Sequence, residues 1–185
     1  MNLNFANKVT VFRILAVPFF IGTIVYYTPE REYLKDIALG IFIVAVISDL
    51  IDGYIARTRK EKTKAGALLD PLADKLLLIS AFISLYKMGS ILGPVTFPLW
   101  VVLAVISLDI ILLLGSMIIY TTQGHIAIEP TRWGKSTTFF QILSIFGVLL
   151  QIPFSPVIWY VTVLLTVISG VGYIRRGIKI LNAGT

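Results

Sequence analysis

The sequence predicts an all-α polytopic membrane protein with six transmembrane helices and cytoplasmic termini. First, 57% of the residues are hydrophobic, 14% are charged and the mean hydropathy is +0.88, which is too apolar for an ordinary soluble domain. Second, six apolar runs approach the roughly 20 residues that cross about 30 Å of hydrocarbon. Third, basic residues gather on one side of these runs. The chain has no cysteine, which excludes a disulfide framework and a thiolate metal site.

The first run, 9–28, contains Arg13 and does not end in a small-residue cleavage signal. It is therefore interpreted as a retained helix and not as a removable signal peptide. No internal repeat, low-complexity tract or long linker divides the chain, so residues 1–185 are predicted to form a single domain. The five runs that follow are 34–56, 67–86, 95–120, 136–152 and 156–174.

An even number of spans places both termini on one side, and the positive-inside rule makes that side the cytoplasm. The sequence thus predicts a multi-pass protein of the cell (inner) membrane. The net charge of +6 suits a face resting on anionic lipid, and no nucleic-acid partner is expected. The basic residues that would lie inside are Lys8, Arg13, Arg57, Arg59, Lys60, Lys62, Lys64, Arg132, Lys135, Arg175, Arg176 and Lys179, and those outside are Arg31, Lys35 and Lys87.

Four of the ten carboxylates gather in one stretch at the predicted cytoplasmic interface, SDLIDGYIARTRKEKTKAGALLDPLADK at 48–75. Asp49 and Asp52 are three residues apart and Asp70 and Asp74 four apart, spacings that place each pair on one helix face. Ionised carboxylates crowded at the edge of hydrocarbon either take up protons or bind cations. An all-oxygen set points to a hard ion such as Mg²⁺ or Mn²⁺, and four carboxylates can hold two ions.

The same stretch carries small residues and one arginine that suit a phosphate-containing ligand. Gly53, Ala56 and Gly66 would let a helix or a planar ligand approach the backbone closely. Arg57 follows Gly53 by one helical turn, and a guanidinium near metal ions suits a phosphate or diphosphate. Because Pro71 follows Asp70, either Asp70 caps a helix that starts there or the helix begins near Gly66 and kinks.

These residues spell D-x2-D-G-x2-A-R-x8-G-x3-D-x3-D, which resembles the complete signature of the CDP-alcohol phosphatidyltransferases. The resemblance covers nearly the whole chain, because that family also has six transmembrane helices with cytoplasmic termini. It implies metal-dependent transfer of a phosphatidyl group from a CDP-linked lipid, typically CDP-diacylglycerol, to an alcohol hydroxyl, with release of CMP. It also implies a homodimer surrounded by membrane lipids.

The resemblance assigns roles to residues of the signature. Asp74 would act as general base on the attacking hydroxyl and also contact metal. Gly53, Ala56 and Gly66 would line the cytidine pocket, and Arg57 would contact the diphosphate. The implied ligands of two Mg²⁺ or Mn²⁺ ions are Asp49, Asp52, Asp70 and Asp74.

Three further segments are similar to bacterial phosphatidylglycerophosphate synthases: NKVTVFRILAVP at 7–18, LDPLADKLL at 69–77 and GKSTTFFQ at 134–141. This branch implies glycerol 3-phosphate as the acceptor. Arg132 and Lys135 are then candidates to bind that anion, although positive charge on a short cytoplasmic loop explains them equally well.

Leu108 and Asp109 depart from that branch, which usually carries Arg-Glu there, whereas cardiolipin synthases of the family usually carry Arg-Asp. Phosphatidylglycerol as a lipid acceptor therefore remains an alternative, as does another alcohol such as an inositol phosphate. Asp109 lies in mid-span, where it would stay protonated, pair with Lys75 or face the acceptor cavity. From another class of protein, a divalent-cation transporter is the alternative, but its acids should lie deep in several spans.

Overall fold

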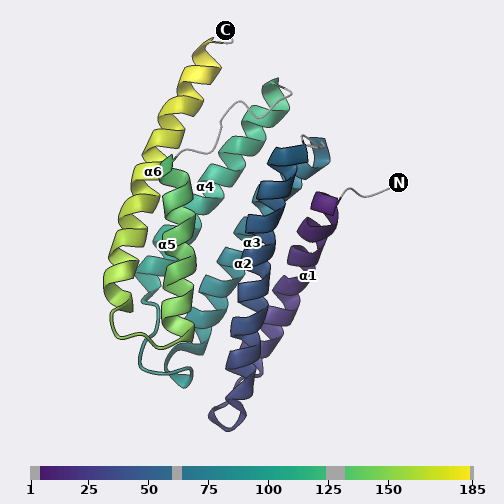
Figure 1. Ribbon diagram of the computed structural model, residues 1–185. Helices are drawn as coiled ribbons and strands as arrows, with labels where there is room; N and C mark the ends of the chain where they lie inside the picture. Colours follow the sequence, from purple (N-terminus) through teal and green to yellow (C-terminus); the bar gives the residue numbers. More distant parts are fainter. Residues whose placement is uncertain (1–4, 60–63, 124–131, 184–185) are drawn as a thin grey trace. The chain divides into compact units, whose positions relative to one another are not determined.

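The computed structural model describes residues 5–59, 64–123 and 132–183, with side chains for 9–51, 72–115 and 133–175. The described residues are helical and contain no strand, which confirms the all-α prediction for this part of the chain (Figure 1). The helices are α1 (Phe5–Val25), η1 (Pro29–Arg31), α2 (Tyr33–Arg59), α3 (Lys64–Met88), η2 (Gly89–Ile91), α4 (Leu99–Gln123), α5 (Arg132–Leu149) and α6 (Ser155–Ala183).

Each of the six predicted apolar runs corresponds to one α-helix, and the ends differ by up to nine residues, the most at the end of α6. The helix α4 begins at Leu99 and not at 95, directly after Pro98. Proline cannot donate a backbone hydrogen bond, and the Pro98 carbonyl instead accepts one from the Val101 amide. In α3, Asp70 and Pro71 lie inside the helix, because it starts at Lys64, so Asp70 is not the cap.

The helices form two compact units, one with α1, α2 and α3 and the other with α4, α5 and α6. In the first unit α1 packs against both α2 and α3 (Figure 1). Its core combines alanines with larger side chains, and the rings of Phe20 and Phe42 lie 5.9 Å apart between centroids. In the second unit α6 packs against both α4 and α5. The prediction of a single domain over 1–185 stays a prediction.

The second unit has a polar seam between α5 and α6. Its side chains recur at helical spacing and are buried. Ser144 Oγ lies 2.8 Å from Thr162 Oγ1, and the Thr162 hydroxyl also lies 3.1 Å from the Phe140 carbonyl. Hydroxyls that bond across or along helices satisfy polar groups where water is excluded. Further buried polar side chains on these two helices are Thr137, Gln141, Thr166 and Ser169.

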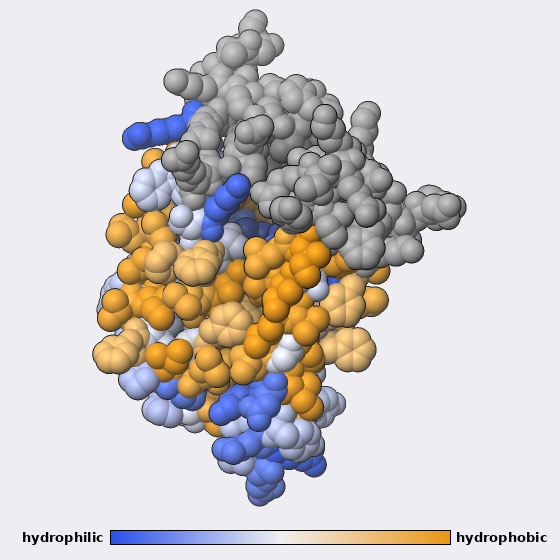
Figure 2. Space-filling model, viewed as in Figure 1, coloured by the Kyte–Doolittle hydropathy of each residue, from blue (hydrophilic) through white to orange (hydrophobic). Residues whose placement is uncertain are grey.

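Large apolar side chains remain exposed on every helix, among them Phe19, Leu50, Ile83, Leu103, Phe139 and Leu164. On the face shown in Figure 2, many apolar residues lie at the surface, and hydrophilic ones gather where α1 connects to α2. Within the described residues, Ser155–Arg175 is the one segment long and apolar enough to cross a membrane by length and composition. The shorter apolar segments are Val9–Val25 and Leu99–Gly115.

The α5–α6 hairpin depends on a close approach at Gly147. The turn places Gln151 at φ 54°, and the Ile152 amide donates to the Gly147 carbonyl at 2.8 Å. A Cβ at Gly147 would overlap the Ser155 hydroxyl and lie 3.1 Å from Ser155 Cβ. Ser155 is fully buried and its hydroxyl donates to the Ile152 carbonyl at 2.6 Å, so moving the hydroxyl aside would break that hydrogen bond.

We expect Gly147→Ala to lower the free energy of unfolding by about 1–3 kcal/mol, because the added methyl group overpacks the hairpin. Gly22→Ala is the matched control, since a Cβ at Gly22 meets nothing within 4 Å. Replacing a helical glycine in open space should stabilise the chain by up to about 1 kcal/mol. Unfolding of both variants in one detergent measures the difference, and equal stability of the two would contradict this account.

Candidate functional site

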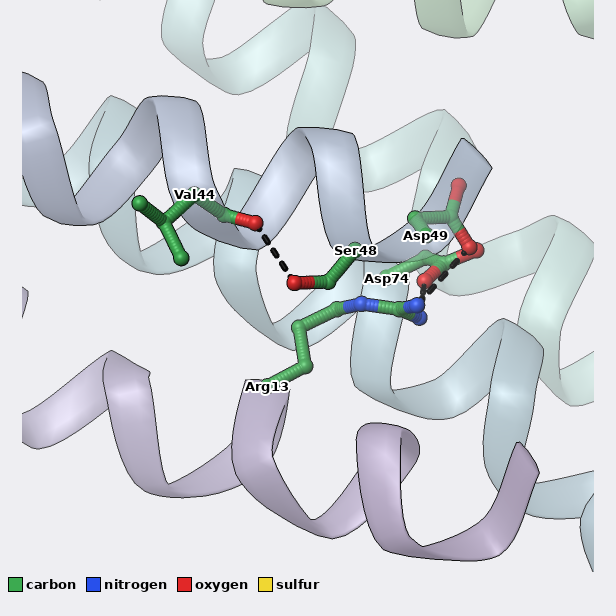
Figure 3. A network of polar contacts seen from close by, with 5 residues as sticks. All are labelled: Arg13, Val44, Ser48, Asp49 and Asp74. Carbon is green, nitrogen blue, oxygen red and sulfur yellow. Dashed lines mark hydrogen bonds and ion pairs between the residues drawn. The ribbon is translucent and has the colours of Figure 1, made fainter. Parts of the chain in front are cut away.

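The guanidinium of Arg13 is the centre of the ion pairs in the first unit. Arg13 lies on α1, and its side chain is 2% exposed. Its Nη2 lies 3.0 Å from Oδ1 of Asp49 on α2, and its Nη1 donates a hydrogen bond to Oδ1 of Asp74 on α3. Figure 3 shows the side chain reaching from α1 toward both carboxylates. One buried cation therefore joins acids from two other helices.

Small residues bring these three helices together at the site. Ala16 lies almost one turn after the arginine on α1, Ala45 lies one turn before Asp49 on α2, and Ala73 directly precedes Asp74 on α3. All three alanines are buried. Small side chains let helix backbones approach closely, so the long arginine side chain can span the remaining distance to both acids.

The site is buried on the arginine side and open on the carboxylate side. The side chains of Asp49 and Asp74 are 41% and 30% exposed, against 2% for Arg13. A guanidinium stays charged at any ordinary pH, so burying it requires nearby anions. The two acids supply that charge, and their exposed side remains accessible to a ligand that approaches from outside the helices.

The structure brings together one acid from each predicted pair. Asp52 lies one turn after Asp49 in α2, and Asp70 lies one turn before Asp74 in α3. Convergence of all four carboxylates stays a prediction. The predicted site residues whose side chains lie outside the described residues are Asp52, Gly53, Ala56, Arg57, Gly66, Asp70 and Arg132.

The donors that are described fit a hard divalent cation. Asp49 and Asp74 converge on a single positive group, and Mg²⁺ and similar ions prefer carboxylate oxygens. The guanidinium shows that positive charge is accommodated between the ends of these side chains. Among the residues with described side chains, no group of three or more His, Cys, Asp or Glu is close enough to hold a metal. The described part of the site thus provides two of the four predicted ligands.

Of the two predicted acceptor-binding residues, Lys135 is described. It is exposed and lies in the first turn of α5, which begins at Arg132. Within this turn the Trp133 carbonyl accepts a hydrogen bond of 2.9 Å from the Thr137 hydroxyl. An exposed ammonium is compatible with binding an anionic acceptor and equally with a simple topology signal.

Asp109 has a partner that sequence reasoning did not identify. The residue is fully buried on α4, and Gln141 Nε2 of α5 donates to its two carboxylate oxygens at 3.3 and 3.1 Å. Gln141 is also fully buried. A charge or polar group in mid-helix needs such a partner, but spacing along one helix does not reveal which residue of another helix supplies it.

Arg13 is the functional candidate whose role the sequence did not reveal. The sequence predicts Arg13 as a cytoplasmic basic residue, within an N-terminal segment that resembles the family. One signal was available, because a charged residue within an apolar run requires an anionic partner, and four aspartates lie in the next two helices. Choosing Asp49 and Asp74 among them required the packed structure.

The family model described as CDP-alcohol phosphatidyltransferase matches residues 3–168. The chain belongs to the CDP-alcohol phosphatidyltransferase family. This confirms the resemblance seen in the signature, and it identifies the chain as a CDP-alcohol phosphatidyltransferase, an enzyme of phospholipid biosynthesis. The family generally depends on divalent cations, in agreement with the carboxylate oxygens of Asp49 and Asp74 that lie beside Arg13.

Curated relatives are similar along nearly the whole chain. A "Probable phosphatidylglycerophosphate synthase" of Mycobacterium tuberculosis is 32% identical over 95% of this chain and 82% of its own length. A "CDP-diacylglycerol--glycerol-3-phosphate 3-phosphatidyltransferase" of Haemophilus influenzae is 31% identical, over 95% of this chain and 94% of its own length. One of the same name from Bacillus subtilis is 30% identical over 97% of both chains.

We expect Gln141→Leu to lower the free energy of unfolding by about 1–3 kcal/mol, because it removes donors from a buried carboxylate. Asp109→Asn should be milder, since the asparagine oxygen still accepts from Gln141. Ser107→Ala is the control on the same helix as Asp109, because Ser107 is exposed and its hydroxyl bonds within the helix, to the Leu103 and Ala104 carbonyls at 2.6 and 3.4 Å. Unfolding of the purified variants in detergent checks the order, and a neutral Gln141→Leu would contradict it.

Proposed function

We propose that this CDP-alcohol phosphatidyltransferase transfers the phosphatidyl group of CDP-diacylglycerol to glycerol 3-phosphate, giving phosphatidylglycerophosphate and CMP. The observation that carries the proposal is the similarity to glycerol-3-phosphate phosphatidyltransferases over at least 95% of this chain. The pairing of Asp49 and Asp74 supports it, because these are the first and last aspartates of the signature.

The reaction is a displacement at the phosphorus of the phosphatidyl group. The acceptor hydroxyl oxygen forms the new P–O bond, and the bond from that phosphorus to the bridging diphosphate oxygen breaks. The bond's electron pair leaves with CMP. Asp74 takes the hydroxyl proton, and its carboxylate is suited to this because it is partly exposed on the open side of the site.

Asp49, Asp52, Asp70 and Asp74 would hold the divalent cation, with two ions of Mg²⁺ or Mn²⁺ as the finer proposal. Such ions, when bound, offset the negative charge of the diphosphate and of the departing CMP. The contact with Arg13 on α1 would hold the carboxylate of Asp49 in place on α2.

The remaining residues of the signature would bind the two substrates. Gly53, Ala56 and Gly66 leave room for cytidine beside the backbone, and Arg57 contacts the diphosphate. On the second unit, Arg132 and the exposed Lys135 would bind the phosphate of the acceptor. A binding site for the CDP-lipid at the membrane interface would let its polar head stay hydrated.

The chain would perform this reaction as a multi-pass protein of the cell membrane, with all six α-helices spanning and both termini in the cytoplasm. The exposed apolar side chains on every helix support contact with lipid. The basic residues support a cytoplasmic active site. The proposal includes that two copies of the chain form a homodimer.

The acceptor is the first test of this function. Purified chain in detergent should release CMP from radiolabelled CDP-diacylglycerol only when glycerol 3-phosphate and a divalent cation are added. Phosphatidylglycerol, serine and inositol phosphate should give no more than a background rate. Rapid CMP release with phosphatidylglycerol instead would favour a cardiolipin-type synthase. No CMP release, combined with divalent-cation flux into vesicles, would favour a transporter.

We expect Asp74→Asn to lower the rate of CMP release by about 100-fold or more, because the amide cannot take the hydroxyl proton. Asp36→Asn is the matched control, since it makes the same change at an exposed position in the first turn of α2. Thermal unfolding shows whether each variant is folded. Normal CMP release from a folded Asp74→Asn chain would refute the assignment of the base.

A further inference from the structure

Arg13 contacts the oxygens that the proposed cation site would use. Its two terminal nitrogens lie against Oδ1 of Asp49 and Oδ1 of Asp74, on two different helices. We propose that Arg13 is a built-in counter-cation that competes with divalent cations for these two carboxylates. This inference rests on the proposed function in one respect, which is that Asp49 and Asp74 are cation ligands.

The distances make the competition direct. Arg13 Nη2 lies 3.0 Å from Asp49 Oδ1. A Mg²⁺ ion binds a carboxylate oxygen at about 2.1 Å, so an ion on this oxygen would lie no more than about 5 Å from the guanidinium nitrogen. Even at the dielectric constant of bulk water, a unit charge about 5 Å from a dication changes the affinity by roughly tenfold.

Burial prevents Arg13 from escaping this repulsion. Its side chain is 2% exposed and extends between α1 and the acids of α2 and α3 (Figure 3). It has no short route into water, whereas the two acids keep an exposed side. An incoming cation therefore meets the carboxylates from outside while the guanidinium stays behind them, and both positive groups must share the same anions.

The consequence for the enzyme is a cation site that is weak until further negative charge arrives. A diphosphate bound beside the carboxylates would offset the repulsion between Arg13 and the cation. By linkage, the cation and the nucleotide lipid would then each increase the affinity for the other. Arg13 is thus a positioning residue, because it acts through Asp49 and Asp74 and not on the reacting atoms.

The test measures Mn²⁺ binding to the purified full-length chain, in detergent and with no nucleotide, from the loss of the free-ion electron paramagnetic resonance signal. Arg13→Gln should lower the Kd for Mn²⁺ by about tenfold or more relative to the wild type. Arg31→Gln is the matched control, since it removes one positive charge at an exposed position on η1 and should leave the Kd unchanged. A Kd for Arg13→Gln that equals or exceeds the wild-type value overturns the proposal.

Two further variants keep the test decisive. Arg13→Lys retains the charge but has a single ammonium in place of the two-nitrogen fork, so its Kd should fall between those of the wild type and Arg13→Gln. If Arg13→Gln does not fold, a Kd for Arg13→Lys that is no lower than the wild-type value overturns the proposal. Asp74→Asn should weaken Mn²⁺ binding, and an unchanged Kd would mean that the ion binds elsewhere, which also overturns it.

The binding assay separates this inference from the proposed function. Wild-type chain that releases CMP, together with no gain in affinity for Arg13→Gln, removes the role of Arg13 and leaves the reaction intact. Wild-type chain that releases no CMP with any acceptor removes the proposed function, while tighter Mn²⁺ binding by Arg13→Gln still supports the competition.

Discussion

The buried positive charge of Arg13 constrains the first three helices. A guanidinium that is 2% exposed requires anions within contact distance, and this chain supplies them from α2 and α3. Both helices must therefore pack against α1 at the level of Arg13, and buried alanines make that approach close enough. The same interaction fixes the position of two aspartates of the family signature. Packing of the unit and assembly of the site thus have one electrostatic cause.

The two units treat their acids differently, and the difference bears on function. Asp109 is fully buried and accepts hydrogen bonds from the neutral side chain of Gln141. Asp49 and Asp74 are partly exposed and contact a permanent cation. A fully enclosed carboxylate with an amide partner is suited to holding helices together. A partly open carboxylate that already contacts a cation has an exposed side on which a second positive group could bind.

The chemistry of the family is consistent with this placement. The substrate joins a nucleotide diphosphate to a lipid. The enzyme therefore needs oxygen ligands for a divalent cation and also an apolar surface for the lipid chains. The described acids are oxygen donors of the kind that the cation needs, and the exposed apolar side chains on every α-helix are compatible with the lipid contact. Both units bury polar side chains, and hydroxyls bond along and across helices in the α5–α6 seam.

The sequence by itself determined the six helices, the spacing of the aspartates and the family, because apolar runs and motif spacings are local properties of the chain. It also left open whether Asp70 caps α3, and the helix start at Lys64 settled that point. Only the tertiary structure decided that Arg13 joins Asp49 to Asp74, that Gln141 supports Asp109, and that Gly147 must lack a side chain beside Ser155. These contacts depend on how each helix is rotated against its neighbours, which residue spacing within one helix does not specify.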